Sequence, residues 1–364
     1  MKIQNIIQYL EKLAPLSFQE DYDNCGLLVG DADWEFRKAL LCLDITPEVM
    51  QEAMINQCNL VISHHPVIFR GIKKLTKQQP ETEIITCAIK NDIAIYAIHT
   101  NLDNTIKGLN AHVLAKLGAG EFKLLSPKRD MLVKLVTFCP VDYAERVRNA
   151  LFEAGAGHIG HYDCCSFNVS GQGTFRASDN ANPFVGEKKQ LHLEDEIRIE
   201  VVFPDHLMKV VLRNLLAAHP YEEVAYDIYP MKNDFAACGS GLTGKFAIPI
   251  ESSCFLELLK SSLNLQAIRH TATIAKPVST IAICTGAGSF LITEAVKSGV
   301  DVFLTADLKY HDFFIPNNNI LLVDIGHYES EHWVKEWLND VLMENFPNFA
   351  FLISEVNTNP IHYL

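Results

Sequence analysis

The sequence predicts an α/β protein. It consists of one interrupted, two-lobed α/β domain with a mostly parallel sheet, plus an inserted ferredoxin-like domain of βαββαβ order. The length agrees, because 364 residues at about 150 residues per domain correspond to roughly two to three domains. Strand and helix signals alternate at the start of the chain, restart on a smaller scale in the middle and resume at the larger scale near the end. The predicted larger domain spans residues 1–126 and 238–364, and the insert spans 127–237.

The first part of the chain begins with a helix and then alternates strands with helices. Ile3, Ile6, Leu10 and Leu13 fall on one helical face. Short apolar runs predict strands at 39–43, 60–62 and 93–98, and the amphipathic stretches between and after them predict helices at 47–57, 81–91 and 108–117. This rhythm is typical of a parallel sheet with helices on its faces.

The middle of the chain repeats the rhythm with shorter connections. Residues 126–130 are expected to form a linker into the insert. The insert is predicted to contain strands at 132–138, 166–169, 197–203 and 225–229 and helices at 142–154 and 205–218, with a polar, Gly-rich excursion between the second and third strands. This order is that of a ferredoxin-like domain.

The last part returns to the larger pattern. Residues 239–246 are expected to be the return linker, because Phe246 stands where a phosphate-binding P-loop needs Ser or Thr. Strands are predicted at 278–284, 302–304, 320–323 and 350–353, with helices at 290–298 and 328–344.

The composition disfavours two classes of partner. The net charge of −13 argues against nucleic acid, because that affinity comes from Lys and Arg on phosphates. The first helix lacks the apolar core of a signal peptide, and no stretch approaches the roughly 18 apolar residues of a membrane span. We therefore expect no membrane or nucleic-acid partner and a cytoplasmic protein, in which the 10 cysteines are reduced.

Three clusters of His, Asp and Glu follow predicted strands. They are Ser63-His64-His65-Pro66, His99-Thr100-Asn101-Leu102-Asp103 and Gly326-His327-Tyr328-Glu329-Ser330-Glu331. Ligands of open α/β sheets bind beyond the carboxyl ends of strands, so the clusters are expected to meet at one sheet edge. A lone histidine is usually structural. Three such clusters together favour a metal site, because imidazole and carboxylate suit zinc, iron, manganese or cobalt.

The spacing within the clusters bears on the number of ions. His327 and Glu331 are four residues apart at a predicted helix start, so they share a face, whereas Glu329 faces elsewhere. Adjacent His64 and His65 would point to opposite sides of a regular strand. Both can be ligands only from a loop, or if two ions lie on either side of the backbone. Two adjacent histidines with several carboxylates suggest two ions, as in two-metal hydrolases.

Five strings carry a resemblance to a known family: DYDNCGLLVGD, SHHPVIF, HTNLD, LTADLKYHDF and DIGHYESE. In this order and with these gaps they are similar to the NIF-three-like dinuclear metal-centre family, whose members are also labelled GTP cyclohydrolase 1 type 2 homologues. The resemblance covers both halves of the larger domain. The chain departs from the family pattern at Ala306-Asp307, where the family often carries Gly-Glu.

The resemblance implies a metal site with defined ligands. These are His64, His65, Asp103, His327 and Glu331, which would hold two divalent ions per chain (zinc, iron or manganese). Glu331 would be the carboxylate best placed to touch both ions. His99 and His311 also fall on motif positions, and we assign them proton transfer as candidate catalytic residues.

The resemblance also implies an assembly. The insert, with GQGTF, ANPFVGE and HPYEEVAYDIYP, resembles the extra domain of the long bacterial members, which is similar to CutA-type and PII-type signalling folds. Family members form ring-shaped homohexamers, so we expect a homohexamer here.

Two functions stay open at this point. The first is a metal-dependent hydrolase of a small phosphorylated substrate such as a nucleotide, which fits the GTP cyclohydrolase label because ring-opening of GTP needs an activated water. The second is a non-enzymatic metal-binding ring, a scaffold or regulator whose insert senses a small molecule.

Three further segments remain. Two of them have both a structural and a functional interpretation, and the third has a structural interpretation only. Residues 285–289 (TGAGS) form either a tight turn or an anion subsite beside the metals. Gly171-Gln172-Gly173 is expected to be a flexible hairpin. Residues 219–223 (HPYEE) either end a helix or bind a regulatory ligand.

Overall fold

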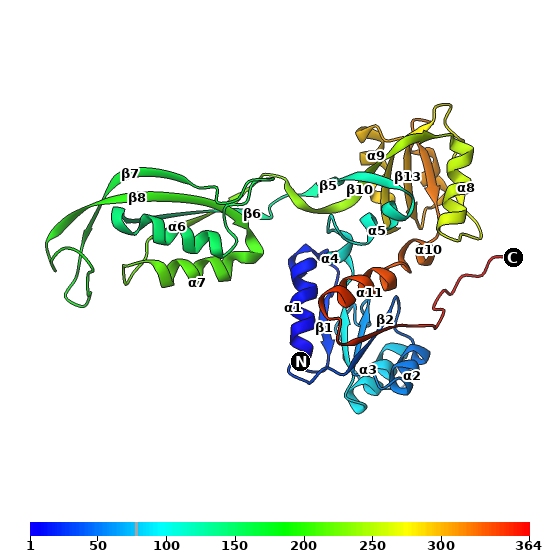
Figure 1. Ribbon diagram of the computed structural model, residues 1–364, viewed down its shortest axis with the longest axis horizontal. Helices are drawn as coiled ribbons and strands as arrows, with labels where there is room; N and C mark the ends of the chain where they lie inside the picture. The colour runs from blue at the N-terminus through cyan, green and yellow to red at the C-terminus, as the bar shows by residue number, and fades with distance from the viewer. Residues whose placement is uncertain (77–78) are drawn as a thin grey trace. The chain divides into compact units, whose positions relative to one another are not determined.

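The structure is a computed structural model that describes residues 1–76 and 79–364. The chain divides into two compact units (Figure 1). Met1–Pro127 and Ala237–Leu364 make the first unit, and Lys128–Ala236 make the second. The predicted α/β class is confirmed, and the larger unit contains two sheets.

The first sheet of the larger unit has five strands in the order β1-β4-β3-β2-β15. Parallel pairing joins β4, β3, β2 and β15, and β1 is antiparallel to β4. The strands are β1 (Gly26–Val29), β2 (Lys38–Cys42), β3 (Leu60–Ser63), β4 (Ala94–Ala97) and β15 (Ala350–Ile353), and nearby helices are α1 (Ile3–Leu13), α2 (Pro47–Ile55), α3 (Pro80–Lys90) and α11 (Val334–Asn345).

Both faces of this sheet are buried, as expected for parallel strands. Successive residues of a strand point to opposite faces. Leu40 of β2 therefore packs in a cluster with Val49 of α2 and Ile84 of α3, whereas Leu41 packs in the core that contains Ile6 of α1. In Figure 1, α1 (blue) and α11 (red) lie side by side, and the Tyr9 hydroxyl donates to the Val341 carbonyl at 3.2 Å.

The second sheet has six strands in the order β11-β14-β13-β12-β10-β5, and β12, β13 and β14 are parallel. Ile283 and Leu304 of this sheet belong to the same buried core as Leu41 of the first sheet, so one core joins the two. The strands are β5 (Ala119–Lys128), β10 (Phe235–Ile250), β11 (Arg269–His270), β12 (Val278–Ala287), β13 (Val302–Ala306) and β14 (Leu321–Asp324), and the remaining helices are α4 (Thr100–Asp103), α5 (Leu109–Lys116), α8 (Ser252–Ser262), α9 (Ile292–Ser298) and α10 (His327–Glu331).

The second unit is built on one antiparallel sheet with the order β7-β8-β6-β9. Along the chain the elements are β6 (Leu132–Pro140), α6 (Ala144–Glu153), β7 (Phe167–Arg176), β8 (Leu191–Pro204), α7 (Met208–Ala218) and β9 (Tyr226–Met231). Both helices cover one face, where Val147 of α6 and Leu215 of α7 pack against Leu135 and Ile199. Its assignment to the ferredoxin-like class stays a prediction.

Three segments that were expected to be irregular are strands. Ser126 and Pro127 belong to β5 instead of a linker, which proline tolerates because β5 is an edge strand. Residues 239–246 belong to β10, where a Cβ on Gly239 would lie 2.4 Å from the Ser126 carbonyl. Gly171 and Gly173 belong to β7, which pairs with β8 along its whole length. Glycine in β10 therefore allows close backbone approach and does not mark a turn.

The single helix predicted at 328–344 is also wrong. It is divided into α10 and α11, with a turn at His332 and Trp333. No glycine or proline marks this break, so it could not be predicted from the sequence.

Candidate metal centre

The three clusters singled out in the sequence converge in the larger unit. His64 and His65 directly follow β3, and His99 follows β4, at the carboxyl edge of the first sheet. His327 and Glu331 begin and end α10, which follows β14 of the second sheet. The expectation of a single sheet edge is therefore wrong, because the site forms where the edges of two sheets meet.

Four imidazole rings have their Nδ1 atoms held by acceptors. His64 is held by the Ile98 carbonyl at 2.8 Å, His65 by Asp44 at 2.7 Å, His99 by Asp23 at 2.9 Å and His327 by Asp307 at 2.8 Å. Carbonyl and carboxylate oxygens only accept, so each Nδ1 carries the hydrogen. The Nε2 atom of each neutral ring then has a free lone pair, which is the usual arrangement of histidines that bind metals.

Glu331 lies at the centre of the cluster and is 2% exposed. Its Oε2 atom is 3.0 Å from His65 Nε2 and 2.9 Å from His327 Nε2. Its Oε1 atom is 3.9 Å from His64 Nε2. Three overlapping groups have ligand atoms within 4.8 Å of one another: His64, His65 and His99; His65, His327 and Glu331; and His64, Asp103 and Glu331. These groups can hold a metal ion.

Buried ligand atoms of the cluster have unmet bonding capacity. Within the described part of the chain, His64 Nε2 and Asp103 Oδ1 have no hydrogen-bond partner, and they lie 3.6 Å apart. Buried polar atoms are rarely left unpaired. A cation among His64, Asp103 and Glu331 would satisfy these atoms, and imidazole nitrogen with carboxylate oxygen is a suitable ligand set for a divalent transition metal. The residues therefore fit a metal.

Without a cation, the carboxylates of Asp103 and Glu331 repel one another, and their pKa values shift in opposite directions. Burial raises the pKa of Asp103, and repulsion from Glu331 raises it further, well above its ordinary range. Burial acts in the same direction on Glu331, but hydrogen bonds from His327 and His65 outweigh it and hold the pKa well below the ordinary value. A bound cation would remove this opposition, because it favours the charged form of both carboxylates.

The pKa values of the histidines also shift in opposite directions. Burial lowers the pKa of His64 to about 3, so this ring is neutral and ready to bind. Burial also acts to lower the pKa of His65, but hydrogen bonds to Asp44 and Glu331 outweigh it and raise the value to about 10. The hydrogen bond to Glu331 is the main reason that the pKa of His327 rises to about 9. In the protein without a cation, these two rings hold protons where ligand bonds would form.

Gly286 makes room for the central carboxylate. Its φ angle is +65°, and a Cβ there would lie 2.1 Å from Glu331 Oε1. Its backbone N–H donates to Ser330 Oγ at 2.8 Å, and Ser330 Oγ donates to the His327 carbonyl at 2.8 Å. The tight turn predicted at residues 285–289 is therefore wrong for its first half, because residues 285–287 continue β12. Gly286 lies there at a shift of strand register between Ile283 and Ala287 and leaves the space for Glu331.

His311 is placed away from the cluster. It lies in a short 3-10 helix (Tyr310–Phe314), is exposed, and contacts the rings of Tyr310 and Phe314. Among the described residues it belongs to none of the three groups. Its assignment to proton transfer therefore has no support in the geometry, whereas His99 lies among the ligands.

Three aspartates orient the histidines, and the sequence did not mark them as site residues. Asp44 follows β2 at the same sheet edge as His64, so the rule about strand ends applies to it as well. Asp23 lies in the first family-like string, and Asp307 lies where the chain departs from the family pattern. The structure gives Asp307 a clear place, because it holds His327 Nδ1.

A cavity of about 190 Å³ adjoins the cluster. His99, Asp103, His327 and Glu331 line it together with Thr285 and the exposed residues Tyr22 and Phe290. Sites for whole small-molecule ligands are usually about 300 Å³ or more. This cavity therefore fits the reacting part of a substrate better than a complete nucleotide.

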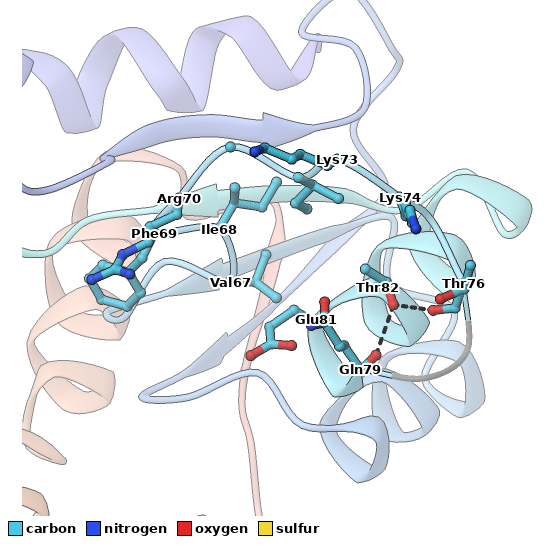
Figure 2. A pocket seen from close by; sticks show the side chains of 12 residues that line it. Val67, Ile68, Phe69, Arg70, Lys73, Lys74, Thr76, Gln79, Glu81 and Thr82 are labelled. Carbon is cyan, nitrogen blue, oxygen red and sulfur yellow. Dashed lines mark hydrogen bonds between the residues drawn. The ribbon is translucent and has the colours of Figure 1, made fainter.

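A basic loop lies between β3 and α3, and Figure 2 shows side chains that it carries. It carries Arg70, Lys73 and Lys74, all exposed, and it borders a cavity of about 700 Å³. The Phe69 ring of this loop packs edge-on against the His99 ring with centroids 5.9 Å apart. The Asn24 side chain donates to the Ile68 carbonyl at 2.6 Å. Three basic residues of a strongly acidic chain thus lie on a loop whose Phe69 contacts the His99 ring.

The fold and the site define an α/β protein with a cluster of histidines and carboxylates between two sheets that could hold a metal ion. The model of the Duf34/NIF3 (NGG1p interacting factor 3) family matches residues 1–360, and the chain belongs to this family. Across the described residues, no helix has the length and apolar character that crossing a membrane requires.

Similar proteins cover the whole chain. A Bacillus subtilis (strain 168) protein named GTP cyclohydrolase 1 type 2 homolog is 37% identical, covering 99% of this chain and 98% of the relative. A Halalkalibacterium halodurans protein of the same name is 33% identical over the full length of both. The crystal structure of a Bacillus cereus protein related to NIF3 is 34% identical, with a TM-score of 0.84, covering 100% of this chain and 99% of that one.

Proposed function

We propose that the protein is a metal-dependent hydrolase that acts on a small phosphorylated substrate, such as a nucleotide, with two divalent ions per chain (zinc, iron or manganese). One observation carries the proposal: four imidazole Nε2 atoms and two carboxylates converge beside a cavity that has room for a reacting group. The name GTP cyclohydrolase 1 type 2 homolog, borne by the relatives, supports a purine nucleotide.

The ligand groups support two ions that share Glu331. His64, Asp103 and Glu331 would hold one ion, and His65, His327 and Glu331 the other, because Oε1 and Oε2 of Glu331 face different histidines. Divalent ions at such a site lower the pKa of water toward about 7 and polarise the oxygen of the electrophile.

His99 and Thr285 supply functions of the chain itself. His99 lines the cavity, and Asp23 holds its Nδ1–H, so Nε2 is free to accept a proton and Asp23 would stabilise the resulting imidazolium. Thr285 also lines the cavity, and within the described residues its buried hydroxyl has no hydrogen-bond partner. We assign it the role of orienting a polar group of the substrate.

The surroundings of the site support a nucleotide. Tyr22 is 70% exposed and Phe290 66% exposed at the cavity, where flat rings can pack against a base. Arg70 on the basic loop follows Phe69, whose ring contacts the His99 ring, so Arg70 is the residue of this loop that we assign to a substrate phosphate.

The test combines metal content with turnover on the full chain. Purified protein is loaded with zinc, iron or manganese, the bound metal is counted by elemental analysis, and release of formate and phosphate from GTP and other nucleotides is followed. We expect near two ions per chain and turnover that Glu331→Gln abolishes. Glu329→Gln is the matched control, because it lies in the same helix and accepts from Asn359 instead of facing the cluster.

Two outcomes would count against the proposal. Metal uptake without turnover of any phosphorylated or nucleotide substrate would favour the alternative, a non-enzymatic metal-binding scaffold or regulator. Absence of metal after loading would remove the site on which both functions rest. The homohexamer implied by the family resemblance is a separate proposal, and light scattering of the eluted protein tests it.

A further inference from the structure

The second unit contains a cavity of about 320 Å³ that the proposed hydrolase does not use. It lies on the face of the sheet opposite α6 and α7, because Glu196 alternates with Ile197 and Ile199, which pack under those helices. The walls come from β7, from the loop before β8 and from the loop after α7. Its volume is in the range of small-molecule sites.

Three of the four aromatic residues that line this cavity have rings close to one another. The Phe175 ring lies 6.4 Å from the Tyr221 ring, and the Phe184 ring lies 6.3 Å from it, by centroids. The loop that carries Phe184 is tied down, because the backbone N–H of Asn182 donates to Glu222 Oε1 at 2.6 Å. Tyr221 belongs to the HPYEE segment, and Phe175 to the GQGTF segment.

Glu196 provides a fixed negative charge between these rings. Its Oε1 accepts from the Tyr221 hydroxyl at 2.9 Å. Its Oε2 lies over Gly173, where a Cβ would be 2.2 Å away, so only glycine leaves this space open. Burial and the Glu196 carboxylate both raise the pKa of Tyr221, and the hydroxyl stays protonated and able to donate. The sequence GQG therefore seats a carboxylate.

The charge of the lining selects for cations. Glu222 and Glu223 join Glu196 in it, and none of the described residues that line the cavity is Lys, Arg or His. Aromatic faces attract cations, most strongly when water is excluded. A guanidinium prefers both oxygens of a carboxylate, but one oxygen of Glu196 is already occupied by Tyr221. An alkylammonium group does not need both oxygens of a carboxylate, and its alkyl part can pack against the aromatic rings.

We propose that this cavity binds a small alkylammonium cation, with the Phe175, Phe184 and Tyr221 rings around the charged group and Glu196 opposite it. The proposal does not depend on the metal centre or on hydrolysis. It gives the inserted unit a ligand of defined chemistry, as expected if this unit senses a small molecule.

Calorimetric titration of the full chain tests the proposal with choline as the probe. The neutral control ligand is 3,3-dimethylbutan-1-ol, in which carbon replaces the charged nitrogen. We expect saturable binding of choline and at least about tenfold weaker binding of the alcohol, because only choline gains from the rings and Glu196. Equal binding of the two, or no saturable binding of choline, would overturn the proposal. Tighter binding of methylguanidinium than of choline would also overturn it.

Paired variants locate the site. Glu196→Gln should weaken choline binding about tenfold, whereas Glu194→Gln, two residues away on the same strand face, should leave it unchanged. Gly173→Ala should weaken binding by displacing Glu196, whereas Gly171→Ala, with open space at its Cβ, should not. Circular dichroism confirms that each variant is folded. Equal affinity of Glu196→Gln and the parent protein would contradict the assignment.

Discussion

The metal centre and the aromatic cavity of the insert both contain carboxylates, but these carboxylates have different interaction partners in the two sites. In the metal centre the carboxylate of Glu331 is buried among imidazoles, and Asp103 and His64 have buried atoms without a partner in the described structure. In the insert, Glu196 is half-buried and already accepts from Tyr221. Unsatisfied ligand atoms suit a small, highly charged ion, whereas one paired carboxylate among rings suits a bulky cation of low charge density.

The two regions also share a structural feature, a glycine that leaves space for a carboxylate. Gly286 leaves space for Glu331, and Gly173 leaves space for Glu196. In both cases the missing Cβ admits a carboxylate oxygen at a distance that no side chain could allow. Glycine therefore determines where the negative charge sits in each cavity, and substitution at these positions tests the comparison directly.

The largest effect is expected for Gly286→Ala. Its Cβ would lie 2.1 Å from Glu331 Oε1, so the carboxylate must move and metal binding should be lost as fully as in Glu331→Gln. Elemental analysis of the folded, metal-loaded protein measures this. The alanine also adopts a positive φ angle, which costs about 1–2 kcal/mol of stability.

Gly299→Ala is the control that distinguishes backbone strain from the steric clash with Glu331. Its φ angle is +72°, and nothing lies within 4 Å of the added Cβ. This variant should lose similar stability in thermal unfolding but keep its metal. If Gly286→Ala retained the full metal content, the position of Glu331 would not depend on that glycine.

The second-largest effect is expected from a change of pH. It tests the difference between a metal ion in the metal centre and an alkylammonium cation in the insert. Metal must displace the protons that hydrogen bonds to Glu331 stabilise on His327, with a pKa of about 9, and on His65, with a pKa of about 10. Below pH 9 both rings are protonated in the metal-free protein, so affinity should rise with pH, by about a hundredfold per unit when two protons leave. The rise should end as the pH passes about 10.

Calorimetry in buffers of different ionisation enthalpy counts the released protons. Zinc binding near pH 8 should release one proton each from His65 and His327, and choline binding to the insert should release none. Metal affinity that does not change between pH 6 and pH 8 would show that these rings are not ligands.

The smallest effect is expected for Asp307→Asn. Asparagine still tolerates the left-handed backbone at this position, where φ is +57°, and it can still accept from His327 Nδ1. The loss of charge should weaken metal binding about tenfold, as is common for groups that orient ligands. Asp312→Asn is the control, because Asp312 accepts from the Lys309 backbone and not from a histidine. A competition titration with a chelator measures both affinities.

The parallel strands of the larger unit could be predicted, and the glycine-containing antiparallel strands could not. Leu40–Cys42 and Leu60–Ile62 form continuous apolar runs because both faces of their sheet are buried. In β10 and β7, glycines interrupt the alternation, and glycine ordinarily indicates a turn. The reasons for these glycines are contacts with Ser126 and Glu196, which are distant in sequence and so invisible before folding.

The candidate ligands could be predicted because they follow strands in short strings of imidazole and carboxylate. His64, His65, Asp103, His327 and Glu331 all lie in the cluster. The residues that orient them could not be predicted in the same way, since nothing in the spacing of Asp23 and Asp307 distinguishes them from other acids of the chain. His311 also falls on a motif position, but among the described residues it belongs to none of the three ligand groups.

The pairing of β15 with β2 sets an order of assembly during synthesis. Residues 350–353 complete the first sheet, the Ser354 backbone N–H then donates to the Leu41 carbonyl at 2.9 Å, and the Thr358 hydroxyl donates to Asp44 at 2.9 Å. The acid that orients His65 is thus secured only after almost the whole chain has left the ribosome. The insert is contiguous from Lys128 to Ala236 and has all its strands earlier. A nascent chain therefore carries a finished insert before it can accept a metal.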